Sequence, residues 1–382
     1  MQKKIIAIAI AATLSAPAFA DVTPYGIIDG AIASVSASGQ KSDLIAVSGG
    51  ASTSRLGAKI TEDLGNGLTA VGVLEYGLDT ETNQQAAPAT TTTVSGAVSA
   101  VSGTPATATS TTGAASNLAA RQQMLAIAGS FGTVATGYLQ TAGYDWEAKY
   151  DPLAGSSASN LQTVNSTFLI GTAAVAKRAQ RAIAYISPDL NGLTLAVNYS
   201  TALDGLGDLK VADSAAAAKT SAYLLGATYA RSVYSVGLVY AATTAPTSAA
   251  SQTEYAVGGS YDFGVAKLFA TFQENNVGAG VSINSAYSAS VVVPVGADAV
   301  AVQYAANTAK AGSNAANSTG QGYTLGYLKT LSKTTTAYAA YQSVTNGSAT
   351  NAYSVDNNVV AGSTLTLGGT SNLIAIGLRK KF

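Results

Sequence analysis

The stretch SNLIAIGLRKKF, residues 371–382, closes the sequence, and its apolar residues alternate with small or charged ones. Successive side chains of a β-strand point to opposite faces. One face of this stretch therefore collects the apolar residues Ile374, Ile376, Leu378 and Phe382. The last residues of a soluble domain ordinarily fray into water. An alternating strand that stops on an aromatic residue instead predicts a terminus that is paired and held against an apolar environment.

The same alternation recurs along the chain. It is present in NGLTLAVNYS (191–200), SAYLLGATYA (221–230), TEYAVGGSYD (253–262) and GYTLGYLKT (322–330). Most of the seven short connections carry the Gly, Asn, Asp or Pro residues of tight hairpins: 63–67, 129–132, 187–192, 231–232, 262–264, 294–298 and 331–334. Eight connections are long: 36–50, 79–119, 139–177, 202–219, 243–251, 276–281, 308–319 and 345–371. These connections separate sixteen strands of about 9–12 residues, the length that crosses a bilayer at a tilt.

The composition fits strands that have one apolar and one polar face. Charged residues make up only 10% of the chain, against roughly 25% in ordinary soluble domains. No apolar run after Ala20 is long enough for a membrane-spanning helix. Hydrocarbon offers no hydrogen-bond partners, so a sheet spans it only when its first and last strands pair. We therefore predict an all-β fold, a transmembrane antiparallel β-barrel of 16 strands with short turns at one end and long loops at the other.

The two ends of the chain and one internal segment suggest the domain organisation. Residues 1–20 combine Lys3 and Lys4, a short apolar run and a small-x-small ending, which predicts an export signal removed after Ala20. A retained N-terminal anchor is the alternative. Residues 21–382 would then form one barrel domain. Within it, 84–117 is rich in Ala, Thr and Ser, which favours a low-complexity external loop over a linker between two domains.

Several chemistries have little support in the sequence. With 20 basic and 20 acidic residues, the chain lacks the basic excess of a nucleic-acid-binding protein. It has no Cys and no His, the usual disulfide, metal and general-base residues. The stretch YDWEAKYDP (144–152) carries paired acids as in glycoside hydrolases, and VDNN (355–358) carries oxygen ligands for Ca²⁺, but neither has a partner motif. We predict no enzymatic activity, no cofactor and no metal site.

Six stretches, in order along the chain, resemble the general porins of Gram-negative bacteria, of the β-proteobacterial type. They are SRLGAKITEDLGNGLTAVGVLEYGLD (54–79), RQQMLAIAGSFGTVATG (121–137), YDWEAKYDPLAG (144–155), RAIAYISPDLNGLTLAVNYS (181–200), LSKTTTAYAAYQ (331–342) and IGLRKKF (376–382). The resemblance implies a homotrimer of 16-stranded barrels in the outer membrane, in contact with lipid and lipopolysaccharide. It implies short periplasmic turns, long extracellular loops and a third loop, 139–177, folded into the pore. It also implies that the terminal aromatic, Phe382, is read as an assembly signal by the outer-membrane assembly machinery.

Strand parity and the resemblance together predict a basic wall for the pore. If Leu56 and Ile60 face lipid, Arg55 and Lys59 face the lumen, and Arg55 also matches a family arginine. Lys59 is near enough to a short turn to be a rim charge instead. Glu75 faces inward on the next strand and is expected to neutralise a neighbouring arginine.

Two further arginines complete the predicted wall. Arg178 faces inward if Ile183 faces lipid, and it matches the family pattern less securely than Arg55. Arg121 shares the parity of Leu125, so the pattern does not decide whether Arg121 faces the lumen or lies at the rim of the barrel. The family commonly has an arginine where this chain has Tyr138, so one expected wall charge is missing.

The resemblance also nominates the acids of the inward loop: Asp145, Glu147 and Asp151. Opposed fixed charges around a narrow waist bias which ions enter. The expected function is passive diffusion of small hydrophilic solutes and ions, weakly anion-preferring or nearly unselective. A barrel-anchored surface or adhesion protein that uses 84–117 is the main alternative, and a secreted β-helix or sandwich is a further one.

Overall fold

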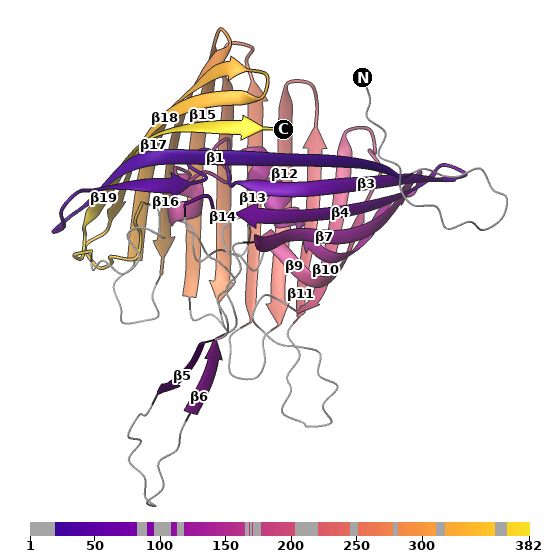
Figure 1. Cartoon of the computed structure of the whole chain (residues 1–382), viewed down its shortest axis with the longest axis horizontal. Helices are drawn as coiled ribbons and strands as arrows, with labels where there is room; N and C mark the ends of the chain where they lie inside the picture. The colour runs from indigo at the N-terminus through magenta and orange to yellow at the C-terminus, as the bar shows by residue number, and fades with distance from the viewer. Residues whose placement is uncertain are drawn as a thin grey trace, which may run out of the picture.

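The computed structural model describes residues 20–81, 90–94, 108–112, 118–164, 168, 170, 177–202, 221–244, 251–277, 282–310, 318–355 and 365–382. The predicted export signal lies almost entirely outside these residues. Within them, 17 strands form one antiparallel sheet, and β5 (Thr90–Val94) pairs with β6 (Ala108–Thr112) as a separate hairpin. Figure 1 shows this hairpin projecting away from the large sheet. Among the described residues, no helix is long and apolar enough to cross a membrane.

The strands of the large sheet follow one another around it in chain order. Their bounds are β1 (Asp21–Ala37), β2 (Asp43–Ser48), β3 (Arg55–Gly65), β4 (Leu68–Leu78), β7 (Leu118–Gly129), β8 (Gly132–Gln140), β9 (Arg178–Ile186), β10 (Leu193–Ala202), β11 (Ser221–Ala230), β12 (Tyr234–Thr244), β13 (Gln252–Asp262), β14 (Lys267–Val277), β15 (Ser282–Val295), β16 (Asp298–Ala309), β17 (Ser318–Ser332), β18 (Thr335–Asn346) and β19 (Thr370–Lys381). Two helices, α1 (Ala142–Tyr150) and α2 (Asn160–Val164), lie between β8 and β9.

The sheet closes on itself, because β1 pairs with β19 from Ile27 opposite Lys381 to Ala37 opposite Ser371. β2 and β3 pair with successive stretches of β1, so together they make one interrupted strand. With β2 and β3 counted once, the 17 strands make 16 crossings of a closed antiparallel barrel. The predicted fold is confirmed, and closure leaves no sheet edge for lipid to meet.

The interruption between β2 and β3 was not expected. The sequence predicted a loop over 36–50, but residues 43–48 form β2. The break begins at Gly49, whose φ of +80° favours glycine. Asp29 of β1 supports it, because its carbonyl accepts hydrogen bonds from the Gly49 N–H and the Ser54 hydroxyl, both at 3.0 Å. At this break the Ser54 side chain forms the hydrogen bonds with the Asp29 backbone that a neighbouring strand would otherwise form.

Side chains are distributed as in a protein with an apolar exterior and a polar interior. Many large aliphatic and aromatic side chains of the strands are exposed; Ile376 is 68% exposed and Leu125 is 61% exposed. The alternate positions are small or polar and buried, and Gln273 and Gln303 are fully covered. This arrangement is the reverse of a soluble sandwich, whose core is apolar. It is the pattern that a bilayer requires of a barrel.

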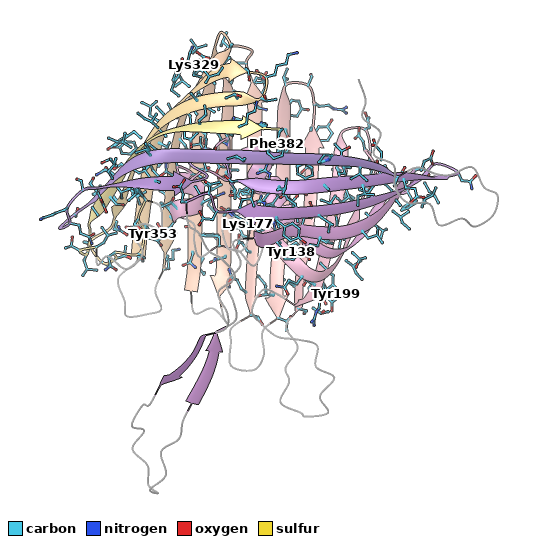
Figure 2. The ribbon with its side chains drawn as sticks, viewed as in Figure 1. Tyr138, Lys177, Tyr199, Lys329, Tyr353 and Phe382 are labelled. Carbon is cyan, nitrogen blue, oxygen red and sulfur yellow. The ribbon has the colours of Figure 1, made fainter. Side chains whose placement is uncertain are left out.

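Aromatic residues that are exposed or half-buried gather at two heights on the barrel. At the end with the short turns, which we call the turn end, they include Phe131, Tyr185, Tyr234, Tyr261, Phe263, Tyr327 and Phe382. A second row lies nearer the opposite, or loop, end, and strand pairing links its members: Tyr199, Tyr223, Tyr240, Tyr255, Phe272, Tyr287, Tyr304, Tyr323 and Tyr341. Figure 2 shows Lys329 at the turn end and Tyr199 towards the loop end. Two such belts bracket the lipid-facing band of membrane barrels.

Candidate functional site

β7 carries a β-bulge at Arg121. Glu75 and Tyr76 of β4 pair with the residues on either side of Arg121, which itself has no partner on β4. An extra residue in one strand shifts the alternation of side chains beyond it. Arg121 therefore leaves the face of Leu125 and turns inward, where it is only 9% exposed. The bulge decides the orientation that the sequence pattern left open.

Glu75 of β4 lies between two guanidinium groups on the inner wall. The Arg121 Nε donates to Glu75 Oε1 at 2.7 Å, and the Arg55 Nε lies 3.7 Å from Oε2. The hydroxyl of Tyr25, from β1, donates to Oε2 at 3.0 Å. Glu75 thus neutralises a neighbouring arginine as expected. One carboxylate faces two guanidinium groups, so the cluster keeps a net positive charge.

Arg178 joins this cluster through the loop. Its Cζ lies 5.0 Å from the centroid of the Tyr144 ring, and Arg121 Nη2 donates to the Tyr144 hydroxyl at 3.5 Å. The Nε and Nη2 atoms of Arg178 have no hydrogen-bond partner among the described residues. An aromatic ring attracts a cation without neutralising it. Tyr144 of α1 therefore contacts both arginines and leaves their charge in place.

Lys59 lies on the same face of β3 as Arg55 but nearer the turn end, where it pairs with Thr23 and Val73. Its side chain is exposed. The four intervening steps along the strand correspond to about 13 Å. The structure therefore groups Arg55, Arg121 and Arg178 and sets Lys59 apart from them along the strand.

The connection between β8 and β9 enters the barrel from its first turn. The Thr141 hydroxyl accepts a hydrogen bond from the Tyr144 N–H at 3.3 Å and so caps α1. The Ala142 N–H donates to Asn198 Oδ1 of β10 at 2.8 Å. This side chain of the inner wall fixes the start of the helix.

The end of α1 presses against glycines of the opposite wall. A Cβ at Gly237 or Gly258 would lie 2.6 Å from the Tyr150 ring, so these two positions require glycine. The Tyr150 hydroxyl lies 2.8 Å from Ser235 Oγ. Trp146 and Tyr150 are buried against β11–β13, which makes this side of the loop a fixed lining of the wall.

Three wall side chains hold α2 through Asn160. The Asn160 N–H donates to Gln303 Oε1 at 2.6 Å, and its Nδ2 donates to Thr324 Oγ1 at 2.7 Å. Gln342 Nε2 donates in turn to Asn160 Oδ1 at 3.0 Å. Gly322 leaves room for this amide, since a Cβ there would lie 2.4 Å from Asn160 Oδ1. A buried polar network of this kind fixes a single loop position.

The first two predicted acids occupy different environments. Asp145 is exposed on α1. Glu147 is 1% exposed, with Lys177 Nζ 3.4 Å from its Oε1, and it accepts a hydrogen bond from Gln162. Burial raises the pKa of Glu147 to about 7, and the Lys177 ammonium opposes that rise.

The third predicted acid, Asp151, is 2% exposed and bonded on both oxygens. Gln303 Nε2 donates to Oδ1 at 2.7 Å, and the Ser159 hydroxyl donates to Oδ2 at 2.6 Å. Burial raises the pKa of Asp151 above its usual range. Asp151 thus ties the loop to β16, and Asp145 is the member of the predicted set that remains exposed.

Three participating residues were not predicted from the sequence: Tyr25, Tyr144 and Lys177. Each depends on a loop path or a strand pairing that no local pattern reveals. Tyr138, the departure from the family pattern, pairs with Gln123, and the two line a cavity of about 390 Å³ with Ala120 and Gln180. No group of three metal-ligating side chains occurs in the described part of the chain.

The geometry defines a class of protein. A closed barrel with an apolar exterior, a polar interior and an internal loop that faces a charged wall is the architecture of an outer-membrane channel. Residues 7–349 match the family model described as Gram-negative porin. This chain belongs to that family, and it is a multi-pass β-barrel of the outer membrane.

Individual relatives agree with this assignment. The chain is 29% identical over 394 residues to outer membrane porin protein 32 of Delftia acidovorans, with 100% of both chains covered. A solved anion-selective porin from Comamonas acidovorans is similar at 25% identity and a TM-score of 0.69, over 95% of this chain and 100% of that one. OmpT of Vibrio cholerae in its trimer form shares the fold at 16% identity and a TM-score of 0.61, over 95% and 99% of the two chains.

Proposed function

We propose that the chain forms a water-filled channel through which small hydrophilic solutes and ions cross the outer membrane by passive diffusion, with a weak preference for anions. The observation that carries the preference is the cluster on the inner wall. Arg55 and Arg121 share one carboxylate, Glu75, and Arg178 lies against the ring of Tyr144, which adds no charge. Fixed charge in a narrow lumen raises the local concentration of the opposite ion.

The acids of the loop limit that preference. Glu147 is paired with Lys177, and Asp151 is buried in hydrogen bonds, so neither adds a free negative charge to the lumen. Asp145 is exposed, and its carboxylate lowers the anion preference that the arginines produce. The similarity to an anion-selective porin also supports a preference for anions over cations. We therefore propose a basic wall of Arg55, Arg121 and Arg178, with Lys59 as a separate charge towards the turn end.

The reversal potential in a salt gradient tests this wall. One unit charge several ångströms from a watery path contributes on the order of 0.5–1 kcal/mol. Replacing Arg178 with Ala should therefore lower the anion-to-cation permeability ratio roughly two- to fivefold. Lys329→Ala is the matched control, because Lys329 is an exposed cation that pairs with Asp298 outside the cluster. An unchanged ratio in Arg178→Ala and Arg55→Ala would refute the basic wall.

We also propose that the barrel is a homotrimer whose protomers meet along one arc of the wall. The aromatic row at the loop end runs from β10 to β18. On the neighbouring arc the exposed large side chains between the two ends are aliphatic: Ile28, Ile32, Leu44, Leu56, Leu74, Leu125, Ile374 and Ile376. An interfacial aromatic row has no role where a protein neighbour replaces lipid. The trimer form of a solved relative supports this reading.

Contact with lipid distinguishes the two arcs. The chain contains no cysteine, so a single introduced one can carry a fluorescent label. A label at Leu225→Cys should be quenched by brominated lipid, whereas a label at Ile376→Cys should be protected. Equal quenching at both positions would remove the basis for this interface.

A further inference from the structure

The terminal strand, β19, contributes one charged side chain to the inner face of the barrel. Ile374, Ile376 and Leu378 alternate along this strand and are exposed on the outer face. Arg379 follows them in the sequence, so it points inward like Ala375, which is buried. The Arg379 side chain is half-buried. The stretch that ends the chain therefore presents a guanidinium group towards the lumen.

Arg379 lies opposite the middle of the first strand and not at the rim of the barrel. Its partner on β1 is Asp29, the central residue of Asp21–Ala37. Arg55 begins β3 on the other side of β1, where it lies opposite Ile27. Arg379 and Arg55 thus flank β1 at positions two residues apart, which corresponds to about 12 Å between their Cα atoms. Inward arginines therefore stand on both sides of β1, at the seam where the barrel closes.

The carboxylate of Asp29 is fixed by contacts on the inner wall. Asp29 is fully buried, and its Oδ1 accepts hydrogen bonds from the Tyr338 hydroxyl and, at 3.4 Å, from the Ala51 N–H. Tyr338 comes from β18 and lies across β19, where a Cβ at Gly377 would lie 2.3 Å from its hydroxyl oxygen. A Cβ at Gly50 would lie equally close to that oxygen. The two glycines thus leave room for the tyrosine that holds the Asp29 carboxylate in place.

The charge of Arg379 is not cancelled by a direct ion pair. Among the described residues, no carboxylate forms a salt bridge with Arg379, and its Nε has no hydrogen-bond partner. The Oδ2 atom of Asp29 also has no partner in that part of the chain. Oppositely charged side chains that face each other on neighbouring strands attract. Asp29 is fully buried in the wall whereas Arg379 is only half-buried, so the guanidinium is the charge nearer to the lumen.

We propose that Arg379 is a further selectivity-determining residue of the channel, a cation that the terminal strand adds to the basic wall, and that the Asp29 carboxylate behind it limits its effect. This inference rests on the proposed channel function and names one more residue along the same ion path. Fixed charges that line a lumen act together on the ions inside it. The end of the chain then has two separate parts, because the exposed Phe382 ring lies at the turn end whereas Arg379 carries charge on the inner wall.

Substitutions at this pair test the proposal in the full-length protein. Arg379→Ala removes the guanidinium, and Arg379→Lys keeps a positive charge. Asp29→Asn removes the opposing charge and keeps an oxygen that accepts from the Tyr338 hydroxyl. Lys380→Ala is the matched control, because Lys380 is the next residue, is exposed on the opposite face and donates to Thr334 Oγ1 at the turn end. Folding of each variant is checked by heat-modifiable migration on a gel and by circular dichroism.

The readout is the reversal potential of the folded protein in a KCl gradient, which gives the anion-to-cation permeability ratio. We expect this ratio to fall roughly two- to fivefold in Arg379→Ala, to stay near its original value in Arg379→Lys and to rise in Asp29→Asn. Lys380→Ala should leave the ratio unchanged. An unchanged ratio in folded Arg379→Ala, or an equal fall in Arg379→Lys, would overturn the role of Arg379 as a charge. A fall in Asp29→Asn would overturn the role of Asp29.

Charged thiol reagents test the same position after the barrel has folded. The chain has no cysteine, so Arg379→Cys introduces a single thiol. A cationic thiosulfonate added to the conducting channel should raise the permeability ratio of Arg379→Cys, and an anionic one should lower it, whereas Lys380→Cys should respond to neither reagent. The same ratio after both reagents in Arg379→Cys would place this side chain away from the ion path. Absence of conductance in the unsubstituted protein would instead overturn the channel itself.

Discussion

Phe382 and Gly26 exchange two backbone hydrogen bonds, each 3.1 Å long, and a Cβ at Gly26 would lie 2.3 Å from the Phe382 ring. The last residue of the chain therefore pairs with the first strand and covers a glycine with its ring. This contact extends the pairing of β1 with β19 to the end of the chain. The ring itself stays 57% exposed at the turn end, where an interfacial aromatic residue is favoured.

The first prediction concerns this closing contact. Gly26→Val places a branched side chain where the Phe382 ring lies, and overpacking of this kind costs on the order of 1–3 kcal/mol. We expect a lower yield of folded barrel in detergent, measured as the fraction that migrates in the compact form before heating. Gly326→Ala is the control, since the nearest atom to a Cβ there is 3.9 Å away. Equal yields for both variants would show that closure does not depend on this contact.

The second prediction concerns Glu75, the single carboxylate of the arginine cluster. Glu75→Gln keeps the shape of the side chain and removes the charge that faces Arg55 and Arg121. The anion-to-cation permeability ratio should rise roughly two- to fivefold, the opposite direction from Arg178→Ala. Glu62→Gln, a change of the same charge at the turn end of β3, is the control. A fall in the ratio for Glu75→Gln would contradict the placement of this cluster along the ion path.

The third prediction is a pH dependence that arises from Glu147. Its pKa of about 7 lies above the ordinary glutamate value, so the folded protein holds a proton there that the unfolded chain releases. The contribution of this group to stability is thus present at low pH and is lost as pH rises towards 7. As pH falls through 7, Lys177 also loses its negative partner, and the anion preference should increase.

The variant Glu147→Gln shows which part of the pH dependence of ion preference comes from Glu147, because it removes the titrating carboxyl group. The variant should lose the part of the pH dependence centred near pH 7, the pKa of Glu147, and should keep a dependence nearer pH 6 from Asp145, whose pKa desolvation raises to about 6. Reversal potentials measured across both pKa values in both proteins provide the comparison. If the pH dependence persists unaltered in Glu147→Gln, another group is responsible.

The fourth prediction distinguishes the channel from an adhesion protein. The sequence segment 84–117 was the basis of the adhesion alternative, and its described part is the hairpin of β5 and β6. The described part of 84–117 carries no strand of the barrel sheet, so we expect deletion of the segment to leave conductance and ion preference unchanged. Loss of conductance in a folded deletion variant would assign the segment a role in permeation.

The sequence predicted most of the barrel because alternation is dictated by lipid on one side and water on the other. Every predicted short turn connects two paired strands, and the terminal strand closes the sheet as expected. The pattern does not predict which way Arg121 points, because a bulge shifts the alternation of side chains and no residue type in the sequence marks its position. The sequence predicts a loop where β2 lies, because the glycines at 49 and 50 interrupt the alternation although pairing with β1 resumes beyond them.

The candidate site was harder to predict than the fold. Arg55 and Glu75 follow strand parity, so the pattern placed them correctly on the inner face. Tyr144 and Lys177 reach the wall through the path of a loop, and Glu147 and Asp151 are buried by contacts with distant strands. Such contacts join residues far apart in the chain, as the bond between Gln303 and Asp151 does. Only the closed barrel brings them together.

The most direct test of the central claim is the current through purified, folded protein in a planar lipid bilayer. We expect stepwise conductances of uniform size and, in a KCl gradient, a reversal potential that corresponds to a higher permeability for Cl⁻ than for K⁺. A folded barrel that inserts without conducting, or one with a strong cation preference, would contradict that claim.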